Sequence, residues 1–144
     1  MITDAQLLLS DAQANVRNAG TYVSTNTIDL GVARDVGNGE RLFVDFNVDV
    51  AFAGGTSVQF QIITSAAADL SSPTVIDSTA AIVDATLVAG YRVQLPIPPV
   101  QGNGQRYLGV QYVGVGTHSA GSVSARVVHQ IDNRDLYASG FTVA

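Results

Sequence analysis

The chain has 144 residues and a formal net charge of −5, with seven Arg, no Lys, no Cys and no Trp. Nucleic-acid binders normally present a basic face, whereas here the few arginines are scattered along an acidic chain, so nucleic acid is not an expected partner. Without Cys there is no disulfide or thiol chemistry, and without Lys there is no side-chain amine for a Schiff base or an isopeptide bond.

At this length we expect one domain, which buries about 70% of the surface that its unfolded chain exposes and needs no disulfide. The first residues lack the basic region of a signal peptide, and the apolar stretch at residues 7–9 is too short for one. No apolar run approaches the roughly 20 residues that cross a bilayer as a helix. We therefore expect no membrane partner.

Residues 1–20 differ from the rest of the chain and are predicted to form an N-terminal arm. Thr3 and Gln6 have the spacing of a helix capping box, which favours a short helical turn. The apolar residues of the segment have no clean helical face, which favours an extended arm. The sequence leaves both conformations open.

From residue 22 onward, stretches rich in β-branched and aromatic residues alternate with clusters of Gly, Asn, Ser and Pro, which is the pattern of strands and turns. In the clearest strand, the even-numbered apolar residues from Leu42 to Val50 alternate with Asp45, Asn47 and Asp49. This alternation predicts a half-buried strand with an acidic outer face. The predicted strands are 22–30, 42–50, 57–64, 74–77, 80–83, 91–97, 105–113 and 122–129.

About eight strands without a long helix predict an all-β fold, a two-sheet sandwich or jelly roll. The two ends carry apolar side chains without an obvious strand partner of their own. They are either fraying termini or segments that dock on a neighbouring molecule. The predicted organisation is an N-terminal arm at 1–20, a jelly-roll β-sandwich at 21–130 and a C-terminal tail at 131–144.

Acidic and histidine side chains provide no strong catalytic or metal-binding pattern. The aspartates at 29, 35, 45 and 49 suggest either a calcium or acid–base site or a solvated strand face, and the lack of a dense Asp/Asn/Gly loop favours the solvated face. His118 and His129 lie on separate elements, no Gly-x-Ser-x-Gly is present, and two His do not complete a zinc site. We expect no enzymatic activity, cofactor or metal.

Three tyrosines, Tyr91, Tyr107 and Tyr112, suggest either a platform on which a sugar stacks or ordinary packing within the sheets. Aromatic residues at strand positions usually pack, so packing is the favoured interpretation.

Several segments, in order along the chain, resemble the jelly-roll cement proteins of tailed-bacteriophage heads. They are MITDAQLL and SDAQ in residues 1–13, STNTIDLG with ARD and G in residues 24–37, TS and LSSPT in residues 64–74, LPIPP in residues 95–99, and RYL in residues 106–108. Each segment is a turn or strand without specificity of its own, and the ordered set carries the resemblance.

The resemblance implies a structural virion protein with a jelly-roll fold. Such a protein binds the outside of the capsid and non-covalently clamps neighbouring major capsid protein subunits, stabilising the DNA-filled head. The expected partners are the major capsid protein and further copies of this chain, as a dimer or trimer. The expected location is the outer capsid surface, after synthesis in the bacterial cytoplasm.

Position and chemistry suggest which residues contact the capsid or another copy. The candidates are apolar residues near the two ends and charges on predicted outer faces, namely Ile2, Leu7, Leu8, Leu9, Asp45, Asp49, Arg134, Tyr137 and Phe141. The alternative function is a carbohydrate- or receptor-binding jelly-roll module of a phage tail.

Overall fold

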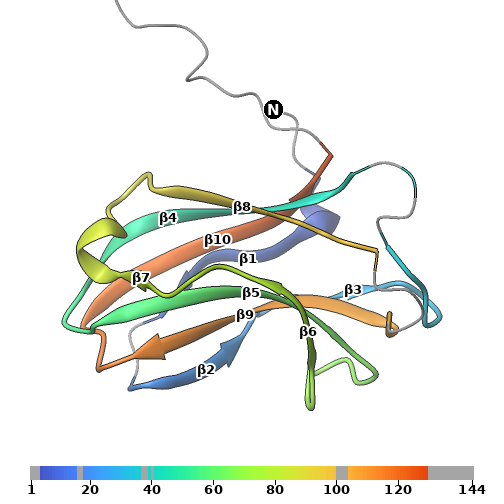
Figure 1. Cartoon of the computed structure of the whole chain (residues 1–144), viewed down its shortest axis with the longest axis horizontal. Helices are drawn as coiled ribbons and strands as arrows, with labels where there is room; N and C mark the ends of the chain where they lie inside the picture. The colour runs from blue at the N-terminus through green and yellow to red at the C-terminus, as the bar shows by residue number, and fades with distance from the viewer. Residues whose placement is uncertain (1–3, 16–17, 37–38, 40, 100–103, 130–144) are drawn as a thin grey trace, which may run out of the picture.

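A computed structural model describes residues 4–15, 18–36, 39, 41–99 and 104–129. In this part of the chain there are ten strands and two short 3₁₀ helices (Figure 1). In chain order they are η1 (Ala5–Leu7), β1 (Leu8–Ala14), β2 (Gly20–Val23), β3 (Ile28–Asp29), β4 (Phe43–Ala53), β5 (Ser57–Ser65), β6 (Thr74–Ser78), β7 (Ile82–Val83), η2 (Asp84–Thr86), β8 (Arg92–Pro96), β9 (Tyr107–Val115) and β10 (Ala120–Val128).

The strands form two antiparallel sheets packed face to face, seen as two layers in Figure 1. The four-stranded sheet has the order β1-β10-β4-β8, and the other has the order β2-β9-β5-β6, with β3 paired to β9 and β7 paired to β5. With the two-residue strands β3 and β7 set aside, each sheet has four strands, and early strands lie beside late ones. This is the double Greek-key order of a jelly roll, so the predicted all-β sandwich is confirmed.

The prediction of an N-terminal arm over residues 1–20 is wrong for Leu8–Ala14, because these residues form β1 and pair with β10. Leu9 is completely buried in the core between the sheets. Ser10 and Gln13 are also buried, and the hydrogen bond between Ser10 Oγ and Gln13 Oε1 is 2.8 Å long. The Tyr112 hydroxyl donates to Ser10 Oγ at 2.8 Å, which ties this edge strand to the opposite sheet.

Strand β4 follows the predicted alternation until a double irregularity at its far end. Val44, Phe46 and Val48 are buried in the core as predicted, whereas Val50 is 52% exposed. The pairing of β4 with β10 shifts on both sides of the Ser122–Val50 pair. Each shift adds one residue to β4, and an extra residue reverses the side of the sheet that a side chain faces. Val50 therefore points outward, and Phe52 is buried again.

The core lies between the sheets and is centred on three rings. Phe46 lies 5.1 Å from Phe60, and Tyr112 meets both rings edge-on, at centroid distances of 6.3 and 5.8 Å. Burial raises the pKa of Tyr112 above its ordinary value, so the hydroxyl stays protonated and donates to Ser10. Among the described residues, no helix has the length and apolar character needed to span a membrane.

Candidate interaction surfaces

The outer face of the four-stranded sheet carries a buried carboxylate, Asp45, held between two arginines. Arg92 donates from Nε at 2.7 Å and from a terminal nitrogen at 2.6 Å, so the pair is bidentate. Arg126 Nε lies 3.4 Å from the same carboxylate. The Asp45 side chain is 0% exposed although it faces away from the core. The hydrogen bond to Asp45 raises the pKa of Arg92, as expected for a charge-assisted pair.

Asp45 therefore does not offer a free negative charge to a partner. Because it is fully buried, the prediction that Asp45 contacts a partner is corrected. Its two oxygens are engaged by Arg92, while Arg126 Nε is buried and has no hydrogen-bond acceptor. One carboxylate and two guanidinium groups give this part of the face a local charge of about +1. The groups that remain partly exposed on this part of the face are the Arg92 and Arg126 guanidiniums, whose side chains are 36% and 23% exposed.

Asp49 lies further along the outer face of β4 and remains partly exposed. Its carboxylate accepts from Asn47 Nδ2 at 2.9 Å and from Ser124 Oγ at 2.6 Å. Asp49 is thus a fixed negative charge separated along the strand from the arginines. The structure places it on the outer face, where the sequence predicted it.

Three apolar candidates near the N-terminus have different positions. Leu7 closes η1 and is 36% exposed, Leu8 is partly buried at the start of β1, and Leu9 is a core residue. Leu9 cannot contact a partner in the folded protein, so this candidate is also corrected. The candidates Ile2, Arg134, Tyr137 and Phe141 lie outside the described residues.

The outer face of the six-stranded sheet is different, because three adjacent rows of it carry no charge. We call these rows the uncharged face. The rows follow the strand register and consist of Val23, Gln111, Gln61 and Ser78, then Thr21, Val113 and Gln59, and finally Val115, Ser57 and Val83. Val83 and Val115 are 54% and 50% exposed. A sheet face in contact with water usually carries charged and polar residues, so two half-exposed valines on either side of the buried Ser57 are unusual.

The glutamines of the uncharged face form a directional chain of hydrogen bonds. Gln111 Nε2 donates to Gln61 Oε1, and Gln61 Nε2 donates to Gln59 Oε1 at 3.1 Å. Gln59 Nε2 then donates to the Thr79 carbonyl at 2.7 Å. The chain fixes the orientation of all three amides, which reduces the side-chain entropy that they would lose in an interface.

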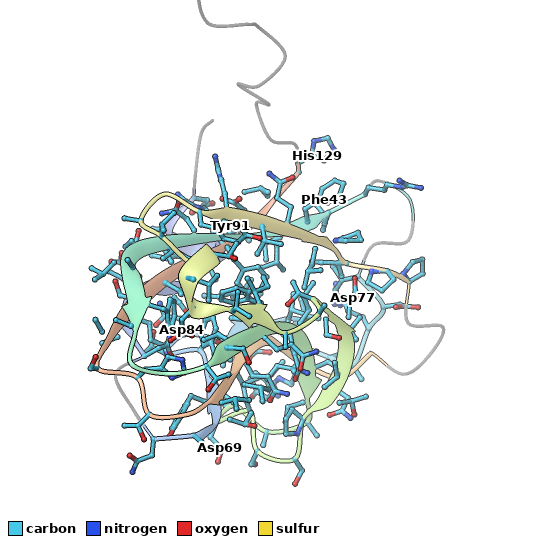
Figure 2. The ribbon with its side chains drawn as sticks, turned by 60° about the vertical axis from the view of Figure 1, so that its left-hand side comes forward. Phe43, Asp69, Asp77, Asp84, Tyr91 and His129 are labelled. Atoms are coloured by element: carbon cyan, nitrogen blue, oxygen red, sulfur yellow. The ribbon has the colours of Figure 1, made fainter. Side chains whose placement is uncertain are left out.

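One end of this sheet is covered by its own chain. Leu70, from the loop between β5 and β6, is 1% exposed and lies directly over Gly109, where an added Cβ atom would clash with Leu70 Cδ1. Asp69 stands on the same loop, at the bottom of the view in Figure 2. Hydrogen bonds from the side chain and backbone of Ser71 lower the pKa of Asp69, which keeps it ionised. The loop separates the uncharged face from the charges at that end.

Those charges are the exposed pair Asp29 and Arg106. The guanidinium donates twice to the carboxylate, both times at 2.7 Å, and also lies over the Tyr107 ring at 5.1 Å. The hydrogen bonds from Arg106, and then the backbone N–H of Gly31, lower the pKa of Asp29 from 3.8 to about 2. This exposed ion pair of the six-stranded sheet can be compared with the ion pair of Arg92 and the buried Asp45 on the four-stranded sheet.

His118 forms a buried contact at the opposite end of the sandwich. Its Nε2 atom lies 3.1 Å from Asp84 Oδ1 on η2, and its ring meets Phe52 edge-on at 5.5 Å. The ring fits closely against Gly55, where an added Cβ atom would clash with Nε2. Figure 2 shows Asp84 on the short coil of η2. His118 is 4% exposed, so the pair joins the loops of this end and is closed to a substrate.

The tyrosines do not form a common platform. Tyr112 is in the core, Tyr91 packs against the core before β8, and Tyr107 lies on the outer face of β9 below Arg106. The packing that the sequence favoured is confirmed for Tyr91 and Tyr112. Nothing in this arrangement favours stacking of a sugar.

Small-molecule and metal sites have little support in the described structure. A pocket of about 210 Å³, partly open to solvent, lies between Ile97 and Leu108 beneath the loop that carries Arg34. This volume includes open solvent, and the enclosed space is far smaller than that of a ligand pocket. Across the described ranges, no group of three or more His, Asp or Glu side chains is placed to hold a metal ion.

The fold and surfaces define an all-β jelly-roll protein with two contrasting outer faces. Residues 9–127 match the family model described as Bbp16, and the chain therefore belongs to the Bbp16 family. The matched residues run from β1 into β10, which is the extent of the sandwich. The comparison with curated proteins found no match.

Proposed function

We propose that this protein is a structural component of a tailed-phage virion that binds the outer surface of the capsid. It clamps neighbouring major capsid protein subunits non-covalently and acts as a homo-oligomer. The ordered sequence resemblance to jelly-roll cement proteins supports the proposal, and so does the jelly-roll topology. Membership of the Bbp16 family is compatible with it.

The observation that carries the proposal is the contrast between the two outer faces of the sandwich. One face presents fixed charges, with Arg126 oriented by Asp45 and Asp49 held by Asn47 and Ser124. The other presents orderly amides and exposed valines without charge. Two flat faces of different chemistry suit a protein that contacts two different protein surfaces. Several weak contacts made at once gain strength from effective concentration.

The direct test is co-sedimentation of the purified protein with phage heads that lack it, followed by electron cryo-microscopy of the pelleted heads. We expect saturable binding and regular density over the junctions between capsid subunits. Heads that pellet without the protein at saturating concentration would contradict the proposal. A receptor- or carbohydrate-binding module remains the alternative, but the separated tyrosines give it no structural support.

A further inference from the structure

We propose that the outer face of the four-stranded sheet, around Arg126, is the surface that meets the phage head, and that it binds an acidic segment of the major capsid protein. The proposal rests on the proposed function and deepens it, because it names the face in contact and the chemistry of the capsid site.

The strand register places the charged groups of this face side by side. Asp45 on β4 pairs with Arg126 on β10, and Asn47 pairs with Arg92 on β8. The Asp45 side chain is 0% exposed, whereas the side chains of Arg92 and Arg126 are 36% and 23% exposed. A neighbouring molecule therefore meets two guanidinium groups, while the carboxylate that partly neutralises them stays covered. The complementary group is a carboxylate, whose geometry matches the fork of a guanidinium.

Arg126 is oriented before any partner arrives. Its Nε atom is buried without a hydrogen-bond partner and lies 3.4 Å from Asp45 Oδ2, which is long for a hydrogen bond. The attraction between the two charges still restrains the guanidinium. A side chain restrained in this way loses little conformational entropy when a carboxylate of another protein binds to it.

Apolar side chains lie beside this positive charge. Residues two apart on a strand share a side of the sheet, so the row of Val128, Phe43 and Pro96 faces outward next to the charged row, in which Leu8 pairs with Arg126. Phe43 and Leu8 are partly exposed, and Pro96 is exposed. Figure 2 shows Phe43 at the upper edge of the sandwich. This combination favours a segment in which an apolar side chain neighbours the carboxylate.

A second copy of this face is a poor occupant. Two-fold packing brings the same patch of both copies together, so the two guanidinium groups of each copy would repel those of the other. It would also cover the partly exposed Asp49, whose carboxylate is held by Asn47 and Ser124 further along β4. Burying such charges is costly. An acidic segment that lies over the Arg126 end of the face avoids both costs.

Co-sedimentation of charge variants with undecorated phage heads tests the proposal. Gln94 is the best position to change, because it is exposed and pairs with Asp45, so a new charge there alters the face without replacing a member of the ion pairs. We expect Gln94→Glu to weaken binding about three- to tenfold and Gln94→Lys to strengthen it by a similar factor. Arg126→Glu reverses the charge itself and should weaken binding at least about tenfold.

Ala68 provides matched controls for the change in net charge. It is exposed on the loop between β5 and β6, next to Asp69, which Figure 2 shows at the opposite end of the molecule from Phe43. Ala68→Glu and Ala68→Lys should both bind like the wild type. Circular dichroism melts establish that every variant is folded.

The chemistry of the partner is tested on the heads themselves. Coupling glycinamide to the exposed carboxylates of undecorated heads with a carbodiimide removes their negative charge, and acetylation removes the positive charge of exposed amines. We expect the first treatment to weaken binding of the wild type at least about tenfold and the second not to weaken it, with electron microscopy showing that the heads are intact.

The outcomes separate this proposal from the proposed function. If the wild type binds heads but Gln94→Glu and Gln94→Lys bind equally well, or if binding survives neutralisation of the head carboxylates, the assignment of this face is overturned and the capsid-binding function stands. If the wild type does not bind heads at saturating concentration, both are overturned.

Discussion

Arg126 illustrates how a single side chain changes the expected chemistry of a surface. The alternating strand pattern suggested an acidic outer face that would meet basic groups of a partner. The structure places Asp45 out of reach between two arginines, and the charged side chains that remain partly exposed there are the guanidiniums of Arg92 and Arg126. A carboxylate of the partner, rather than an Arg or Lys, is the complementary group at this position.

We therefore expect Arg126→Gln to weaken binding to undecorated heads by about three- to tenfold, and the remaining binding to depend less on salt. Arg106→Gln removes an equal charge from the other sheet and should leave the affinity nearly unchanged. Co-sedimentation at two salt concentrations gives both quantities. Equal losses for the two variants would mean that net charge alone, and not the position of Arg126, governs binding.

Asp45 itself is expected to matter for stability more than Asp29. Asp45→Ala leaves the Arg92 guanidinium without its bidentate partner on a crowded surface, which should lower the free energy of unfolding by about 2 kcal/mol. Asp29→Ala breaks a solvent-exposed pair that water and salt screen, so it should destabilise the fold much less than Asp45→Ala. Urea denaturation of both variants measures the difference, and an equal cost would contradict the structural distinction between the pairs.

The pKa of Asp29 gives a second test with a defined sign. Its folded-state pKa of about 2 lies below 3.8, so the Asp29–Arg106 pair stabilises the fold above about pH 4 and loses this effect as pH falls toward 2. Arg106→Gln should return the pKa of Asp29 toward its ordinary value. NMR titration of the Asp29 carboxyl carbon measures it, and an unchanged pKa in the variant would exclude Arg106 as the main cause.

At the scale of elements, the strand pattern predicted which residues of the central strands face the core, but it missed the edge strand β1. Val58, Phe60 and Ile62 on β5 and Leu108 and Val110 on β9 all face the core as their spacing indicated. Strand β1 was missed because its inward positions include Ser10 and Gln13, whose burial depends on hydrogen bonds to distant residues. Periodicity reports apolar burial and is blind to polar groups that are satisfied only by the tertiary fold.

The same limit applies to the surfaces. In the predicted strands 42–50, 91–97 and 122–129, Asp45, Arg92 and Arg126 alternate with apolar residues, so the pattern predicts outward positions for all three. What the sequence lacks is the order of strands, which brings β8 and β10 to the two sides of β4. The glutamine chain of β5 and β9 could not be predicted for the same reason, because it forms across strands separated by about 50 residues.

Removing residues 1–12 is expected to destabilise the sandwich, since it deletes Leu9 from the core and most of β1. The loss should be at least about 3 kcal/mol in the free energy of unfolding. Removing only residues 1–3 leaves β1 complete and should have little effect. Thermal melts of the two truncated chains provide the comparison, and similar melting temperatures would show that β1 contributes little to stability.

The glycine at residue 55 provides a test of the His118 corner. Gly55→Ala would place a methyl group against the imidazole, so we expect a loss of about 2–3 kcal/mol and separation of His118 from Asp84. Gly31→Ala meets no neighbouring atom and should cost about 1 kcal/mol, from its φ of +79° alone. Unfolding experiments measure the loss of stability in each variant, and the NMR signals of the His118 ring show whether the imidazole has moved. An unshifted ring signal in Gly55→Ala would contradict the close packing of the imidazole on this glycine.

At the scale of the whole molecule, the jelly roll is a sandwich of two sheets with one charged outer face and one uncharged outer face. Each side is stiffened by hydrogen bonds that already exist before any partner arrives, which limits the entropy lost on binding. The two outer faces are back to back, so they point in opposite directions.

The pairing of β1 with β10 also affects how the chain can fold during synthesis. Among the described strands, the sheet neighbour of β1 is β10, and the sheet neighbour of β2 is β9. A ribosome releases the N-terminal segment first, so β1 and β2 stay without these partners until residues 107–128 have left the exit tunnel. Contacts this distant in sequence form slowly, and unpaired strands are prone to aggregate in the interval. Within residues 6–13, one serine, one aspartate and two glutamines surround three consecutive leucines, so Leu9 waits in a partly polar segment until β10 has been made.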